Sequence, residues 1–137
     1  MASILIIEDD DLFRVMLVDV LTGYGYTVTQ AANGDEGMKV FEAQPTDLVL
    51  TDIVMPGKEG IATVQDLRRS NPTLGIIAMS GGTAKNAPLY LNLANGLGAD
   101  RTLQKPFSID LLRKTVEEVL ALGHVIRARR TRPPMPS

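Results

Sequence analysis

The stretch ILIIEDDD at residues 4–11 places four consecutive aliphatic residues directly before four acids. An unbroken run of branched residues, without polar alternation, is typical of a strand buried on both faces. Further short runs of this kind occur around Val28 and at residues 48–50 and 76–79, and a fifth strand fits residues 101–104. The pattern predicts five short strands, which form the interior of a sheet.

The segments between the strands carry apolar residues at helical spacing. The last is the most regular, and Ser108 before it is a good N-cap. Its apolar face consists of Ile109, Leu112, Val116, Val119 and Leu120. Earlier helices are expected over residues 13–24, 38–41, 61–67 and 88–97. Because strands and helices alternate, we predict an α/β fold, a doubly wound five-stranded parallel sheet with five helices on its two faces.

Length and composition limit the class of protein. A chain of 137 residues with 45% hydrophobic and 22% charged residues can fold as one ordinary domain. The absence of cysteine and the single histidine exclude disulfides, thiol catalysis, and thiolate or histidine-rich metal sites. Apolar runs are far shorter than the roughly 20 residues of a membrane helix, and no secretory signal is visible. A cytoplasmic protein is therefore expected.

The basic residues are concentrated at the C-terminal end. Four of the 14 lie in the last eleven positions, which leaves ten basic against 16 acidic residues in the rest of the chain. This balance argues against nucleic-acid binding by the folded part. Like charges and three prolines follow Gly123, so we expect a domain over residues 1–122 and a basic, proline-rich, disordered tail over residues 123–137.

Polar side chains stand at the ends of four of the five strands. Glu8 and Asp9 follow the first strand, Asp52 ends the third, Ser80 ends the fourth and Lys105 follows the fifth. In open α/β sheets the ligand crevice lies beyond the carboxyl ends of the strands. These five residues are therefore expected to meet at one edge of the sheet.

Three converging carboxylates need a cation. Two carboxylates about 5 Å apart repel by roughly 3 kcal/mol at an effective dielectric near 20. Oxygen ligands alone select magnesium, manganese or calcium over zinc, and a site with few ligands and room for waters suits Mg²⁺ best. With the ammonium of Lys105, the hydroxyl of Ser80 and the nearby glycine amides, such a site could bind a phosphoryl group, and a carboxylate within it could be the nucleophile.

Simpler explanations exist for each residue taken alone. Asp10 and Asp11 are best explained as an N-cap and a partner of the helix dipole. Asp52 could begin a turn, and a single lysine such as Lys105 is usually a solvated surface residue. The functional interpretation depends on the joint pattern of complementary groups at several strand ends.

Four segments resemble the receiver domain of two-component response regulators. They are ILIIEDD at residues 4–10, DLVLTDIVMPGKEG at 47–60, IIAMSGG at 76–82 and GADRTLQKPF at 98–107. The resemblance covers residues 3 to about 121 and is closest to the stand-alone, single-domain type. It implies a flavodoxin-like sheet with strand order 2-1-3-4-5. It also implies a phosphorylation-activated signalling switch in a phosphorelay, rather than an enzyme with turnover.

The resemblance assigns roles to individual residues. Asp52 corresponds to the phosphoacceptor, Ser80 to the switch hydroxyl and Lys105 to the phosphate-binding lysine, whose bond to Pro106 is expected to be cis. The Mg²⁺ ligands would be Glu8, Asp9, Asp52 and the backbone carbonyl of Val54. The phosphoryl donor would be a sensor histidine kinase or a histidine phosphotransfer protein, and phosphorylation would change binding to a downstream protein that the sequence does not name.

One residue departs from the usual receiver pattern. Thr102 stands three positions before Lys105, where receivers usually have an aromatic residue that swings inward as the switch engages. A threonine cannot move a ring between exposed and buried states. We therefore expect weaker or differently routed coupling between phosphorylation and the surface.

The first helix has an unusual second apolar face. Leu12, Val15 and Val18 lie outside its core stripe. Crowded packing would explain this face, and so would a surface that docks the helices of the phosphodonor.

Competing functions differ in the residues that they require. A phosphohydrolase using an aspartyl-phosphate would typically have a second aspartate two residues after Asp52, where Val54 stands. A receiver-like module that never takes phosphate would lack the acceptor, the acid pair or the lysine. A Rossmann dinucleotide binder would show GxGxxG after the first strand. Without an attached effector, the chain relays phosphate, acts by binding another protein, or belongs to a longer protein.

Overall fold

The computed structural model describes residues 2–53, 59–81, 92, 95–96 and 98–131. Its core is a sheet of five parallel strands in the order β2-β1-β3-β4-β5. The strands are β1 (Ser3–Ile7), β2 (Thr27–Ala31), β3 (Leu48–Asp52), β4 (Gly75–Ser80) and β5 (Arg101–Gln104). The predicted doubly wound parallel sheet, with its strand order 2-1-3-4-5, is confirmed.

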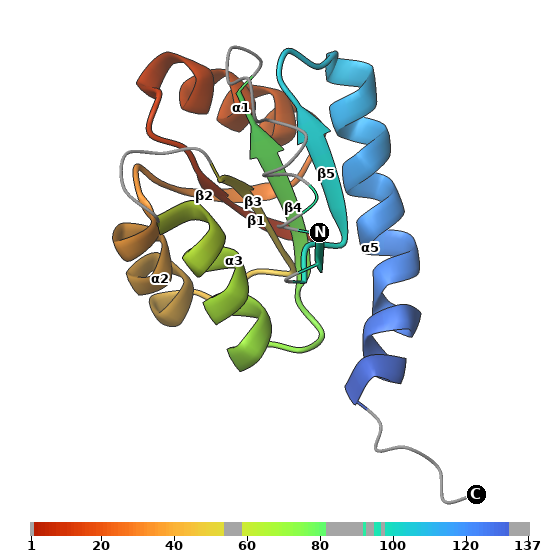
Figure 1. Ribbon diagram of the computed structural model, residues 1–137. Helices are drawn as coiled ribbons and strands as arrows, with labels where there is room; N and C mark the ends of the chain where they lie inside the picture. Colours follow the sequence, from red (N-terminus) through yellow and green to blue (C-terminus); the bar gives the residue numbers. More distant parts are fainter. Residues whose placement is uncertain (1, 54–58, 82–91, 93–94, 97, 132–137) are drawn as a thin grey trace, which may run out of the picture.

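Helices cover both faces of the sheet, as Figure 1 shows. The described residues include four of them: α1 (Asp11–Gly23), α2 (Gly34–Ala43), α3 (Glu59–Ser70) and α5 (Ile109–Thr131). The predicted helix over residues 88–97 lies largely outside the described residues. Helices α1 and α5 pack on one face, and α2 and α3 on the other.

The run at residues 4–7 supplies side chains to both faces at once. Leu5 and Ile7 belong to the apolar cluster under α2 and α3, whereas Ile4 and Ile6 belong to the cluster under α1 and α5. All four are fully buried. Successive side chains of a strand point to opposite faces, so a strand between two helical layers must be apolar throughout.

Side-chain caps fix where the helices begin. Asp10 accepts a hydrogen bond from the backbone N–H of Phe13 at 3.1 Å, and Ser108 accepts one from Leu111 at 3.0 Å. The predicted caps of the first and last helices are therefore confirmed, and Asp11 lies in the first turn of α1, where the helix dipole favours an acid.

The C-terminal segment differs from the sequence prediction. The helix α5 continues to Thr131, so residues 123–131 are helical and not disordered. This segment contains three arginines and one alanine, which favour a helix, and the prolines that stop a helix come only at Pro133 and beyond. Residues 132–137 lie outside the described residues, and the domain boundary at residue 122 stays a prediction. No helix of the described residues is long and apolar enough to span a bilayer.

Candidate functional site

The carboxyl ends of the strands bring the predicted site residues together. Glu8 follows β1, Asp52 ends β3, and Lys105 follows β5. The Nζ atom of Lys105 donates hydrogen bonds to Oε1 of Glu8 and, at 2.9 Å, to Oδ2 of Asp52. One carboxylate oxygen from each of Glu8, Asp9 and Asp52 lies within 4.8 Å of the other two. We call Glu8, Asp9, Asp52 and Lys105 the acidic pocket.

Burial differs among the three acids of the pocket. Glu8 is completely buried and Asp52 is 4% exposed, whereas Asp9 is exposed. Hydrogen bonds between backbone groups hold the strand ends: Ile53 donates to Met79 at 2.9 Å, and Lys105 donates to the carbonyl of Ser80 at 2.8 Å. The pocket is thus built on the ends of hydrogen-bonded strands, with one acid open to solvent.

Ser80, the last residue of β4, lies at the same edge of the sheet. Its side chain is fully buried, and its Oγ has no hydrogen-bond partner among the described residues. A buried hydroxyl without a partner is costly, so it favours a site that receives another polar group. The expected ligand Val54 lies outside the described residues, and the Lys105–Pro106 bond is cis as expected.

Comparison with known proteins identifies the family. The model of the response regulator receiver domain matches residues 4–117. The chain belongs to this family. Receiver domains are signalling domains and not classical enzymes.

Individual relatives agree with this assignment. A probable chemotaxis protein CheY from Rhizobium etli is 36% identical over 118 residues, which cover 85% of this chain and 91% of the relative. The probable C4-dicarboxylate response regulator DctR from Bacillus subtilis is 35% identical over 131 residues, which cover 94% of this chain and 57% of that protein. The response regulator TrrA from Thermotoga maritima, solved in complex with Mg²⁺-BeF, is 30% identical with a TM-score of 0.76, covering 88% of this chain and 100% of that one.

Burial shapes the charges of the receiver domain's acidic pocket. Loss of solvent raises the pKa of Glu8 from 4.5 to about 7; the charge of Asp52 adds to this rise and the hydrogen bond from Lys105 opposes it. Burial also acts to lower the pKa of Lys105, but hydrogen bonds to Glu8 and Asp52 outweigh it and keep the pKa above its usual value. Lys105 therefore stays charged, and one ammonium faces three acids.

Two residues beside the receiver pocket were missed by sequence reasoning. The ammonium of Lys105 lies 4.4 Å from the ring centre of Phe13, which packs edge-on against Phe107 at 5.8 Å. The sequence indicated Phe13 only as part of the core stripe of the first helix. Arg14 donates to the backbone carbonyl of Glu8 at 2.7 Å. No signal in the local sequence points to this contact, because an arginine early in a helix is ordinarily solvated.

The second apolar face of α1 is only partly as predicted. Leu12 is 86% exposed and Val15 49% exposed, and Met16, which was not predicted, is also exposed. Val18 is partly buried against the apolar cluster under α1 and α5, which agrees with crowded packing, the first of the two explanations for this face. The exposed apolar residues of α1 are therefore Leu12, Val15 and Met16.

Proposed function

We propose that this receiver domain accepts a phosphoryl group on Asp52 from a phosphohistidine of a sensor histidine kinase or histidine phosphotransfer protein. The observation that carries the proposal is the meeting of Asp52 with Glu8, Asp9 and Lys105 in one pocket. Phosphorylation then changes the binding of a downstream protein. A donor of this class would meet the protein in the cytoplasm.

The residues present fit a magnesium ion. Glu8, Asp9 and Asp52 are hard oxygen ligands in mutual reach, and the ammonium of Lys105 offsets part of their charge. The backbone carbonyl of Val54 is proposed as the fourth ligand from the protein. Bound Mg²⁺ would supply neutralisation of phosphoryl charge. The Mg²⁺-BeF complex of the TrrA relative supports this choice of metal.

The transfer itself requires little of the protein beyond position and charge. A carboxylate oxygen of Asp52 attacks phosphorus, the new O–P bond forms as the P–N bond breaks, and the donor histidine departs with the electron pair of that bond. Lys105, already 2.9 Å from Oδ2 of Asp52, remains beside the reacting carboxylate and neutralises negative charge. In this proposal the strand ends place the carboxylate and the ammonium, and the domain accepts the phosphoryl group itself without acting as an enzyme with turnover.

Ser80 is proposed to report the phosphorylated state. Its buried hydroxyl, to which no described residue is hydrogen-bonded, can donate to a phosphoryl oxygen on the neighbouring strand end. Such a bond would favour one arrangement of the segment after β4 over another, which is a population shift. Thr102, partly buried in β5 opposite Ala78, supplies no ring to follow this change. We therefore propose that the signal leaves by a route other than the usual aromatic one.

Acetyl phosphate and intact mass spectrometry test the proposal. Wild type should gain the mass of one phosphoryl group in the presence of Mg²⁺ and none in EDTA, and Asp52→Asn should gain none under either condition. The control Asp66→Asn, which changes an aspartate that is 54% exposed on α3, should be labelled like wild type. Labelling of Asp52→Asn at the wild-type rate would refute the assignment of the acceptor.

The exposed residues of α1 suit contact with the donor protein. Leu12 and Val15 lie on α1, which begins two residues after Asp9 of the acidic pocket. A donor protein bound to these residues would therefore be next to Asp52. We expect Val15→Asp to slow transfer from a phosphorylated histidine protein at least about tenfold, as loss of a central apolar contact does in other interfaces. Labelling by acetyl phosphate should stay unchanged. Equal rates with both donors would count against this docking face.

A further inference from the structure

Arg14 joins the first turn of α1 to the two neighbouring strands. Its Nη1 donates to the backbone carbonyl of Glu8 at 2.7 Å, its Nε to Oε1 of Gln30 at 3.0 Å, and its Nη2 to Oδ1 of Asp11 at 2.7 Å. The side chain is only 15% exposed. One guanidinium therefore ties together the end of β1, the edge strand β2 and the start of α1.

The bond to Glu8 is made to the main chain and not to the carboxylate. Arg14 consequently does not occupy the carboxylate oxygens of Glu8, which accept from Lys105 at Oε1 and from the backbone N–H of Asp10 at Oε2, the latter at 3.2 Å. The carbonyl of Glu8 belongs to the same planar peptide unit as the backbone N–H of Asp9. A hydrogen bond to that oxygen therefore fixes the peptide plane that precedes the Cα of Asp9. Asp9 is the exposed acid of the pocket and therefore the least constrained one.

The geometry requires arginine in particular. Three donors on separate nitrogens of one rigid plane reach three acceptors that come from different elements. A lysine ammonium would keep the charge but is a single point on a flexible stem, so it could not hold all three in the same arrangement. The contact of Arg14 with Glu8 therefore depends on shape as well as charge.

We propose that Arg14 is a positioning residue: by holding the carbonyl of Glu8 it fixes the orientation of Asp9 and thereby sets the affinity of the acidic pocket for Mg²⁺. This inference rests on the proposed function for the identity of the cation. Arg14 touches neither the cation nor the phosphoryl group and acts through the peptide between Glu8 and Asp9.

Titration of unphosphorylated protein with Mg²⁺ in a calorimeter tests this role. Groups that orient ligands typically contribute 10- to 100-fold to metal affinity, so Arg14→Lys should weaken Mg²⁺ binding roughly tenfold. Gln30→Ala, which removes one of the three acceptors, should weaken it less. The control Arg69→Gln, whose side chain is 69% exposed on α3, should bind Mg²⁺ like wild type.

A second variant separates position from charge. Removing a positive charge beside carboxylates by itself strengthens cation binding. If Arg14 acted only through its charge, Arg14→Gln would therefore bind Mg²⁺ more tightly than wild type; a positioning role predicts weaker binding in spite of the lost charge. Urea denaturation in EDTA shows whether each variant is folded. A purely structural role would lower the unfolding midpoint and leave the Mg²⁺ dissociation constant of the folded protein unchanged.

The outcomes also separate this inference from the proposed function. Mg²⁺ binding by wild type without phosphorylation of Asp52 would refute the proposed function, while the ranking of Arg14→Lys, Gln30→Ala and Arg69→Gln would still decide the role of Arg14. An Arg14→Lys dissociation constant within about twofold of wild type, tighter binding by Arg14→Gln, or no Mg²⁺ binding by wild type would each overturn the inference.

Discussion

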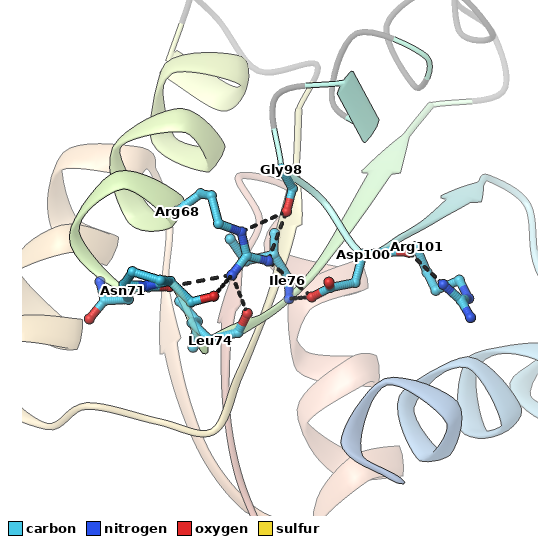
Figure 2. Close-up of polar contacts among 8 residues, drawn as sticks. Arg68, Asn71, Leu74, Ile76, Gly98, Asp100 and Arg101 are labelled. Carbon is cyan, nitrogen blue, oxygen red and sulfur yellow. Dashed lines mark hydrogen bonds and ion pairs between the residues drawn. The ribbon is translucent and has the colours of Figure 1, made fainter. Parts of the chain in front are cut away.

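Two buried ionic groupings lie at opposite edges of the same sheet, and they differ in how fully their polar atoms are paired. The acidic pocket lies at the carboxyl ends of the strands. The other grouping, the Arg68 cluster, lies where β4 and β5 begin and consists of Arg68, Asp100 and the surrounding backbone (Figure 2). The side chains of Arg68 and Asp100 are 14% and 7% exposed.

The Arg68 cluster is balanced in charge and rich in hydrogen bonds. Arg68 donates to Oδ2 of Asp100 at 3.0 Å, and Asp100 accepts in turn from the backbone N–H of Ile76 at 2.9 Å. Arg68 also donates to backbone carbonyls of the connections on either side, those of Asn71, Pro72, Leu74 and Gly98 (Figure 2). The guanidinium is neutralised by one carboxylate and held in place by several carbonyls, so the Arg68 cluster has a structural role.

The acidic pocket has the opposite character. Within the described residues, three acids lie beside the ammonium of Lys105, and the buried hydroxyl of Ser80 has no partner. The contrast teaches that burial of charge alone does not mark a functional site. An excess of one sign together with an unpaired group does, because such a site gains free energy from a ligand that a satisfied cluster cannot gain.

Breaking the Arg68 cluster should have the largest effect on stability. Arg68→Met removes the cation that forms the ion pair with the buried Asp100 and the donor to several backbone carbonyls, so we expect a loss of about 3–5 kcal/mol in the free energy of unfolding. Urea denaturation measures the loss, and Arg69→Met, with a largely exposed side chain, should change the free energy little. A loss below about 1 kcal/mol for Arg68→Met would show that the Arg68 cluster does not stabilise the fold.

The pH dependence of stability should come from the acidic pocket. The pKa of Glu8 is raised from 4.5 to about 7, chiefly by burial. A carboxyl with a higher pKa in the folded state binds its proton more tightly there; its contribution is full below pH 4.5 and is lost as pH rises through about 7. We expect metal-free protein to lose on the order of 2–3 kcal/mol over this interval.

Urea denaturation in EDTA at intervals between about pH 4.5 and 8 measures this loss. Glu8→Gln should flatten the profile, and excess Mg²⁺, which binds the ionised carboxyl, should oppose the decline above pH 7. Stability of metal-free wild type that rises with pH across the interval would contradict the raised pKa of Glu8.

Two glycines, one beside each ionic grouping, allow stability and phosphoryl transfer to be tested separately. A Cβ on Gly60 would lie 2.3 Å from the Cα of Ile53, the residue after Asp52, and a Cβ on Gly98, whose φ is +125°, would lie 2.6 Å from Cγ of Arg68. We expect Gly60→Ala and Gly98→Ala each to lose about 1–3 kcal/mol of stability. Only Gly60→Ala should also slow the labelling of Asp52 by acetyl phosphate.

Gly23→Ala is the matched control for both substitutions. No atom of the residues that the structure describes lies within 4 Å of a Cβ at Gly23, so alanine should leave stability equal or raise it by less than about 1 kcal/mol. Slower labelling of folded Gly98→Ala than of Gly60→Ala would contradict the assignment of a structural role to the Arg68 cluster and of the reaction to the acidic pocket.

The smallest expected effect concerns the unpaired hydroxyl. Ser80→Ala removes a buried polar atom that has no partner in the described part of the chain, so the unphosphorylated protein should become more stable by up to about 1 kcal/mol. Thr51→Val, which removes a buried hydroxyl that donates to the carbonyl of Asp52 at 3.1 Å, should instead cost about 1 kcal/mol. Urea denaturation compares the two; destabilisation by Ser80→Ala similar to that by Thr51→Val would mean that Ser80 is paired after all.

Predictions from sequence succeeded where one residue type has one structural consequence. The fully buried run at residues 4–7, the cap at Ser108 and the strand over residues 101–104 follow from local pattern and were found as predicted. Predictions were less specific where local signals compete. The sequence left open whether Val18 packs inward or belongs to a docking surface, and it packs inward. Residues 123–131 carry like charges that suggested disorder, yet α5 continues through them.

The sequence by itself determined the alternation of strands and helices, and with it the edge of the sheet at which Glu8, Asp52 and Lys105 meet. Side-chain periodicity and right-handed crossovers leave few other arrangements. Tertiary structure alone decided which polar groups are paired: that Arg68 is neutralised by Asp100, that Arg14 holds the carbonyl of Glu8, and that Ser80 is left without a partner in the described residues. Hydrogen bonds depend on distances of a few tenths of an ångström between residues far apart in the chain, and no local pattern specifies such distances.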